Sequence, residues 1–227
     1  MNNMYKNEYI PPTLTVDAIL FQIIDKKLNV LLIQRTGEPF KDQWALPGIY
    51  NAVGETTHHA LSRALLRKAG VDLSQIHRVE QLYTFDTVAR DPRGHAVSVS
   101  YMCLGYDIMP KTDAGVQHPT WFPVDDLPEL AFDHASIIRY ARRRLASKMT
   151  YTNIVAALLP NEFTLSELQV VHEAIFDHSL DKRNFRKKFL SLDFIKETGA
   201  IRQNGAHRPA KLYRFNTRKL QEIVSNY

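Results

Sequence analysis

Residues 182–191, KRNFRKKFLS, hold the densest group of side chains that could do chemistry. Phe185, Phe189 and Leu192 fall at i, i+4 and i+7, a spacing that anchors one face of a helix in a core. Cations cover much of the rest. Arginine can reach guanine edges in the DNA major groove, and lysine can reach phosphates. We therefore predict that this helix contacts DNA through Lys182, Arg183, Asn184, Arg186 and Lys187.

The segment after this helix predicts a basic β-hairpin. Residues 200–215, AIRQNGAHRPAKLYRF, form two strand-like halves around Asn204-Gly205, a strong short-range signal for a tight turn between strands. Its cations suit contacts with the DNA backbone or minor groove. The predicted contact residues are Arg202, His207, Arg208 and Lys211.

The elements that position these residues come in the order of a winged helix. A short helix is expected over 151–160, closed by Pro160. A second follows over 164–176, where Thr164 and Glu167 have the capping-box spacing. Asp181 is a good N-cap for the basic helix. Three helices and a hairpin together predict a winged helix, and the alternative is a small protein-interaction domain with a basic surface.

Charge and composition favour two domains with different partners. Residues 150–227 hold 12 Lys+Arg against 8 Asp+Glu, whereas residues 1–149 hold 17 against 16. The basic excess at the C-terminal end indicates an anionic partner. A length of 227 residues also favours two domains, and we place them at 1–149 and 150–227.

Other classes are disfavoured by the sequence. Cys103 is the single cysteine, so an internal disulfide and a cysteine-based zinc site are excluded. No apolar run has the length of a membrane span, and the first residues lack a signal-peptide core. A cytoplasmic protein without membrane contact is expected.

The N-terminal part predicts a sheet with helices, and hence an α+β protein. β-rich runs at 14–24 and 28–35 flank a turn at Asp25-Lys26-Lys27, and further strands are expected at 79–86, 96–106 and 119–124. One helix is expected over 57–69, ended by Gly70. Another is expected over about 134–148, connecting the two domains, and its predicted inward residues are Ile137, Ile138, Ala141 and Leu145.

The segment PGIYNAVGETTHHALSRALLRKAGV, residues 47–71, resembles a degenerate Nudix box. That box has a glycine, five residues, a glutamate, seven residues, and then Arg-Glu-apolar-any-Glu-Glu-any-Gly-apolar. Ile49 replaces its first glycine. The positions that match the box are Glu55, Arg63, Leu65, Gly70 and Val71. The three later glutamates are replaced by Ala64, Arg67 and Lys68.

These replacements remove a metal site. Positions 64, 67 and 68 share one helical face, and Mg²⁺ prefers oxygen ligands whose charge offsets its own. An alanine and two cations cannot supply them. We therefore expect no bound metal, no cofactor, no catalytic residues and no metal-assisted pyrophosphate hydrolysis. By resemblance, Glu55 and Arg63 form the pair that braces the loop on the helix.

Residues 13–216 as a whole resemble the Nudix-related transcriptional regulators of NAD metabolism, the NrtR group. The matching segments are LAFDHASIIRYARRRL, FTLSELQVVHEAIF, LDKRNFRKKFL and RPAKLYRF. The resemblance implies a Nudix-like mixed β-sheet between helices and a C-terminal winged helix-turn-helix. It implies a homodimeric repressor of operator DNA that senses ADP-ribose or a related metabolite. In relatives the effector can be a sugar such as arabinose. A residual Nudix hydrolase and a protein-interaction adaptor are the alternatives.

The resemblance also implies an effector site. The segment ARDPRGHAVSVSY resembles one shared by these regulators and ADP-ribose hydrolases. Arginine suits bidentate phosphate contacts and an aromatic ring suits adenine stacking, although each arginine could instead form a surface salt bridge. Arg67 and Lys68 replace the metal-binding face and could touch the pyrophosphate directly. The predicted effector-binding residues are Arg35, Tyr50, Arg67, Lys68, Arg90 and Arg93. His134, after Asp133, is expected to be a structural hydrogen bonder.

Overall fold

The computed structural model describes residues 10–111, 117–192, 194–203 and 209–222. Its larger sheet is mixed: β1 and β6 run parallel, and the other pairs are antiparallel. Five strands lie in the order β3-β2-β1-β6-β5, while β4 pairs with β1 and β7 with β2. The strands are β1 (Thr13–Ile24), β2 (Lys27–Gln34), β3 (Trp44–Ala45), β4 (Gly48–Tyr50), β5 (Arg78–Phe85), β6 (Ala96–Leu104) and β7 (Thr120–Pro123).

Helices α1 (Thr57–Ala69) and α2 (His134–Met149) pack on opposite faces of this sheet. Successive side chains of a strand point to opposite faces. Val16, Ala18 and Leu20 of β1 accordingly join the core beneath α1, whereas Ile19 and Phe21 join the core beneath α2. Both faces are therefore buried, which explains why the middle of β1 is mostly apolar and does not alternate with polar residues. The predicted inward residues of α2 are all fully buried, namely Ile137, Ile138, Ala141 and Leu145.

Helix α1 begins and ends where the sequence predicts. The Thr56 side chain accepts a hydrogen bond from the backbone N–H of His59 and caps the first turn. Gly70 ends the helix with φ 63°, in the left-handed region. A Cβ at Gly70 would also lie 2.0 Å from the carbonyl oxygen of Lys111, so the position requires glycine on two grounds. A short 3₁₀ helix, η1 (Leu73–Gln75), follows.

The C-terminal elements have the predicted winged-helix order. They are η2 (Ile154–Leu158), α3 (Leu165–Phe176), α4 (Lys182–Ser191), β8 (Ile195–Arg202) and β9 (Ala210–Phe215). Both side-chain bonds of the Thr164–Glu167 capping box are present. Asp181 caps α4 by accepting from the Asn184 N–H at 2.8 Å.

Two predictions about these elements were wrong. The first helix is only a five-residue 3₁₀ turn, and all five of its residues are buried. Asn153, just before it, binds the carbonyl oxygens of Thr217 and Lys219 instead of capping a helix. Strand β8 begins at Ile195, before the expected Ala200, and carries an irregularity between Glu197 and Ile201. The predicted Asn204-Gly205 turn lies outside the described residues.

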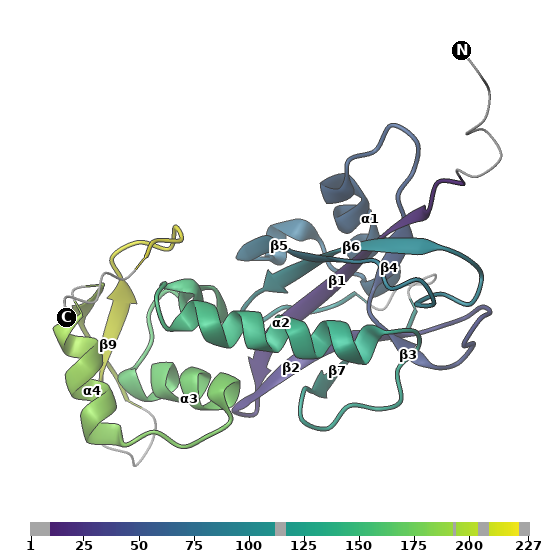
Figure 1. The fold of residues 1–227 in the computed structure, drawn as a ribbon. Coiled ribbons are helices and arrows are strands. Elements are labelled where there is room, and N and C mark those ends of the chain that lie inside the picture. The colour runs from purple at the N-terminus through teal and green to yellow at the C-terminus, as the bar shows by residue number, and fades with distance from the viewer. Residues whose placement is uncertain (1–9, 112–116, 193, 204–208, 223–227) are drawn as a thin grey trace.

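Helix α2 joins the sheet to the C-terminal unit (Figure 1). Its buried side chains belong to one hydrophobic cluster with those of α3, α4 and β9. Arg142 of α2 contacts Asp125 at 2.5 Å and Asp177, at the end of α3, at 3.7 Å. A domain boundary after residue 149 stays a prediction, because this core is continuous across it. Among the described residues, no helix has the length and apolar character needed to cross a membrane.

Candidate functional site

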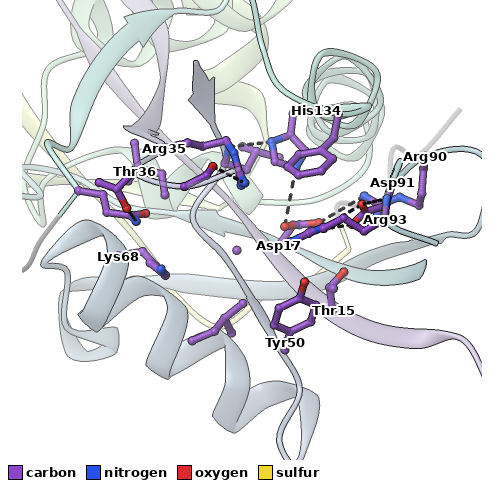
Figure 2. Close-up of a pocket in the computed structure, with 17 residues that line it drawn as sticks. Thr15, Asp17, Arg35, Thr36, Tyr50, Lys68, Arg90, Asp91, Arg93 and His134 are labelled. Carbon is purple, nitrogen blue, oxygen red and sulfur yellow. Dashed lines mark hydrogen bonds and ion pairs between the residues drawn. The ribbon is translucent and has the colours of Figure 1, made fainter. Parts of the chain in front are cut away.

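A cavity of about 280 Å³ opens beside the sheet, between the end of α1 and the start of α2. Figure 2 shows Arg35 and His134 together on one side of it, Tyr50 with Thr15 on another, and Lys68 extending toward it from α1. The predicted effector residues that line it are Arg35, Tyr50, Lys68, Arg90 and Arg93.

The segment that follows Tyr50, the last residue of β4, is braced on α1 by the expected ion pair. Arg63 donates to both carboxylate oxygens of Glu55, at 2.8 and 2.6 Å, and to the carbonyl oxygen of Tyr50 at 2.8 Å. The hydrogen bonds from Arg63 and from the backbone N–H of Ala52 lower the pKa of Glu55 to about 2. This pair fixes the position of Tyr50 at the cavity, so its role in the structure is scaffolding.

Arg90 is the centre of a buried charge network. It donates to both oxygens of Asp133, at 3.0 and 2.7 Å, and contacts Asp17 at 3.5 Å. Ser98 donates to Asp17 at 2.6 Å. These acidic partners raise the pKa of Arg90, because their bonds and charges outweigh the lowering effect of burial. Arg90 is therefore occupied within the protein although it lines the cavity.

His134 completes this network as a neutral hydrogen bonder. Its Nδ1 accepts from the backbone N–H of Leu46 at 2.9 Å, which is the structural role predicted for it. Burial lowers its pKa, since water no longer stabilises the charged imidazolium. His134 lines the cavity and is also the first residue of α2, directly after Asp133. The cavity and this helix therefore share a residue.

An aromatic ring separates two of the predicted arginines. Phe132 lies 4.7 Å from the Arg35 guanidinium and 5.5 Å from that of Arg93, which also faces the Tyr50 ring at 5.5 Å. Phe132 has φ 57°, a strained backbone conformation for a bulky residue that recurs at ligand sites. Arg93 is held by Asp91 at 2.7 Å. Aromatic rings and guanidinium groups thus lie next to one another along the cavity. Rings can stack on a base, and guanidinium groups can bind phosphates.

The two cations that replace box glutamates differ in position. Lys68 is half-buried and lines the cavity, whereas Arg67 is exposed and lies outside its lining. Adjacent helical residues point about 100° apart, and the packing of α1 places Lys68 toward the cavity and Arg67 toward solvent. The structure therefore corrects the prediction that both reach the cavity.

The residues here do not fit a divalent metal. Ala64 is fully buried and offers no ligand. Glu55 has both oxygens engaged by Arg63 and Ala52. Within the described ranges, no group of three or more His, Cys, Asp or Glu side chains is placed to bind a metal ion. Metal-assisted chemistry therefore has no support from the donor set.

Sequence reasoning missed several lining residues, among them Asp17, Phe132 and Gln117. Asp17 interrupts an apolar strand, and an acid at such a position is a signal that something charged meets it. The register places Asp17 opposite Gly48 of β4, where a Cβ would lie 2.1 Å from its oxygen. Phe132 and Gln117 gave no such signal, because only the fold brings them to the cavity.

A second candidate site is the outer face of α4. Phe185 and Phe189 are buried and stack with ring centroids 4.3 Å apart, with His172 of α3 against both. Burial lowers the pKa of His172 to about 4, so it packs there as a neutral ring. The predicted contact residues on α4 are all exposed: Lys182, Arg183, Asn184, Arg186 and Lys187.

The hairpin cations are more constrained than predicted. Arg202 bonds Glu167 at 2.6 Å and the carbonyl oxygen of Glu162 at 3.2 Å. Lys211 bonds Glu197 at 3.0 Å. Nucleic-acid contacts by these two residues stay a prediction. The predicted residues His207 and Arg208 lie outside the described residues.

Two family models match the chain in the order that the structure shows. The NUDIX domain model matches residues 13–141, and the NrtR DNA-binding winged helix domain model matches residues 155–215.

Three relatives are similar to this chain. An ADPR responsive transcriptional repressor, NtrR, of Acinetobacter baylyi is 35% identical over 98% of this chain and 88% of its own. The NrtR of Shewanella oneidensis in complex with a 27mer DNA is 35% identical, with a TM-score of 0.76 over 89% of this chain and 93% of its own. Its NUDIX domain with ADP ribose matches 64% of this chain and 99% of its own, at 36% identity and a TM-score of 0.51.

The third relative is an enzyme. An ADP-ribose pyrophosphatase of Methanocaldococcus jannaschii is 35% identical over 58% of this chain and 73% of its own. Its match covers 58% of this chain, whereas the matches of the two regulators cover 98% and 89%. The chain therefore belongs to the NrtR family of Nudix-related transcriptional regulators.

Proposed function

We propose that this chain is a DNA-binding transcriptional repressor whose Nudix-like domain senses ADP-ribose or a related NAD metabolite. The observation that carries the proposal is that one chain holds both an exposed basic helix and a cavity lined by cations and aromatic rings. Among the described residues, no group of three or more His, Cys, Asp or Glu side chains is placed to hold a metal ion. The relatives support it, because one is named as an ADPR responsive repressor and another was solved with DNA and with ADP ribose.

The cavity suggests a role for each predicted residue. Tyr50 is half exposed and presents a ring on which adenine can stack. Arg35, Lys68 and Arg93 supply cationic groups for phosphates. Arg90 acts as a positioning residue, because its donors already bind Asp133 and Asp17.

Helix α2 offers a path from the effector to the DNA-binding unit. Its first turn carries His134 and follows Asp133, both tied to the cavity network. Its later turns carry Arg142, which reaches Asp177 of the winged helix. An effector that shifts the start of α2 would thereby shift α3 and α4. The contacts of α2 at the cavity and at Asp177 form the physical link. We propose that effector binding is coupled to DNA binding through this helix.

A thermal-shift screen tests the effector class. ADP-ribose, NAD, nucleotides and pentoses such as arabinose are compared at equal concentration. The proposal expects ADP-ribose to raise the melting temperature most, because a ligand that binds only the native state stabilises it. A shift with arabinose and none with ADP-ribose would replace this effector by a sugar.

Hydrolysis is the runner-up function, favoured by the pyrophosphatase relative. We expect incubation with ADP-ribose and Mg²⁺ to release no AMP above a control without protein, because the carboxylates that would hold the metal are absent. Chromatography of the reaction mixture measures this. If the protein hydrolyses ADP-ribose and a Glu55→Gln variant does not, the protein is an enzyme and this prediction is wrong.

A homodimer is part of the proposal. One short recognition helix contacts too few base pairs to be specific in a genome. A dimer binds two half-sites and therefore contacts about twice as many base pairs. Light scattering should give the mass of two chains for the protein on DNA. A mass of one chain, both free and on DNA, would contradict the dimer.

A further inference from the structure

The cations around the cavity fall into two groups. Arg90 and Arg93 are each paired with carboxylates. Arg35 and Lys68 form no ion pair with any described residue, although both line the cavity. Among the described residues, the Arg35 guanidinium donates to the backbone oxygens of Pro39 and Gly37, at 2.8 and 3.1 Å. The cavity therefore presents two positive charges that form no ion pair within the described part of the protein, although the charges of Asp91 and Glu38 partly offset that of Arg35.

These two cations are held in a fixed relation. Gln117 donates from its side chain to Thr36, next to Arg35, at 2.9 Å. Its backbone N–H also donates to the carbonyl oxygen of Lys68 at 3.2 Å. One residue thus ties the loop of Arg35 to the last turn of α1. Burial and the nearby charge of Arg93 lower the pKa of Arg35, so an anion at this place would relieve an unfavourable arrangement.

We propose that the phosphate-bearing effector binds this cavity without a divalent metal, with Arg35 and Lys68 neutralising its pyrophosphate. The inference rests on the proposed function, since it assumes a ligand of that class. A pyrophosphate diester carries two negative charges, which two unpaired cations balance. A Mg²⁺ ion would instead be repelled by both cations, and the lining carboxylates Asp17 and Asp91 are already paired with Arg90 and Arg93.

The neighbouring Arg67 provides a matched control. It carries the same charge as Lys68 and lies on the same helix, but it is exposed and does not line the cavity. A general electrostatic effect of charge reversal would be similar at both positions. A direct contact with phosphate would be confined to Lys68.

Calorimetry with ADP-ribose on the full-length protein tests the inference, in buffer with Mg²⁺ and in buffer with EDTA. We expect wild-type affinities in the two buffers to agree within twofold. In EDTA, Lys68→Glu should weaken binding at least tenfold, Arg67→Glu by less than twofold, and Lys68→Arg by less than about threefold. Melting temperatures of the variants confirm that they are folded, and adenosine binding, which involves no phosphate, should be equal in all of them.

Three results would overturn the inference. Binding that requires Mg²⁺ removes the metal-free claim but leaves ADP-ribose as the effector. Equal losses in Lys68→Glu and Arg67→Glu remove the assigned contact. Absence of wild-type binding in both buffers overturns the proposed effector itself, and this inference with it.

Discussion

Replacing Arg183, Arg186 and Lys187 with alanine is expected to weaken specific DNA binding at least 100-fold. The three side chains are exposed on α4, and the buried Phe185 and Phe189 hold the helix in place. Each good contact to a base edge contributes roughly 1–3 kcal/mol, so losing three exceeds the threshold of about 2.7 kcal/mol that corresponds to 100-fold. Fluorescence anisotropy on a duplex that the wild-type protein selects from a random-sequence pool measures the change.

The control for this experiment is Arg139→Ala, which removes an exposed cation from α2. It should change the affinity less than threefold. The triple variant should also show a weaker dependence of affinity on salt, because fewer counterions are released on binding. Circular dichroism establishes that α4 is still folded. Wild-type affinity in the triple variant would show that α4 is not the recognition helix.

Replacing Arg90 with alanine is expected to lower the free energy of unfolding by about 3–5 kcal/mol, the usual loss when one partner of a buried ion pair is removed. Asp17 would lose its cationic partner at a place where its side chain is 7% exposed. Asp133 would also lose the guanidinium that holds it at the start of α2. Urea unfolding of the two proteins at pH 7 measures the difference.

Two further variants separate burial from charge. Arg93→Ala should lose clearly less stability, because its side chain is 42% exposed and water can replace it at Asp91. Adding Asp17→Asn to Arg90→Ala should recover part of the loss, since the uncompensated charge disappears. A loss for Arg90→Ala no larger than that for Arg93→Ala would contradict the structural role assigned to the network.

The fold was predictable wherever one local signal specifies one element. Helix α1 has its caps and its apolar spacing within the segment itself, and its bounds are confirmed at 57 and 69. The capping box of α3 and the Asp181 cap of α4 are equally local. By contrast, β3 and β4 have two and three residues, too few for any periodicity. Their strand geometry depends on β2 and β1, to which they pair.

The cavity was less predictable because its chemistry depends on pairing across the chain. The sequence predicted that Arg35, Arg90 and Arg93 lie at the effector site, and all three line the cavity. Their different states were not predicted, since Arg90 meets Asp17 and Asp133 only after the sheet and α2 have assembled. Helical spacing placed positions 64, 67 and 68 on one face, but only the packing of α1 decides that Ala64 is buried, Lys68 faces the cavity and Arg67 faces solvent.

Effector binding is expected to change the affinity for DNA, and one titration measures this coupling. ADP-ribose is added in EDTA to the full-length protein on its selected duplex, and the DNA affinity is measured at each concentration. We predict that the DNA affinity changes saturably by at least fivefold, which is the lower range of allosteric coupling between two sites. We also predict that Lys68→Glu shifts this response to higher ADP-ribose concentration. If the DNA affinity is unchanged at an ADP-ribose concentration that saturates binding by calorimetry, the proposed coupling between effector and DNA is contradicted.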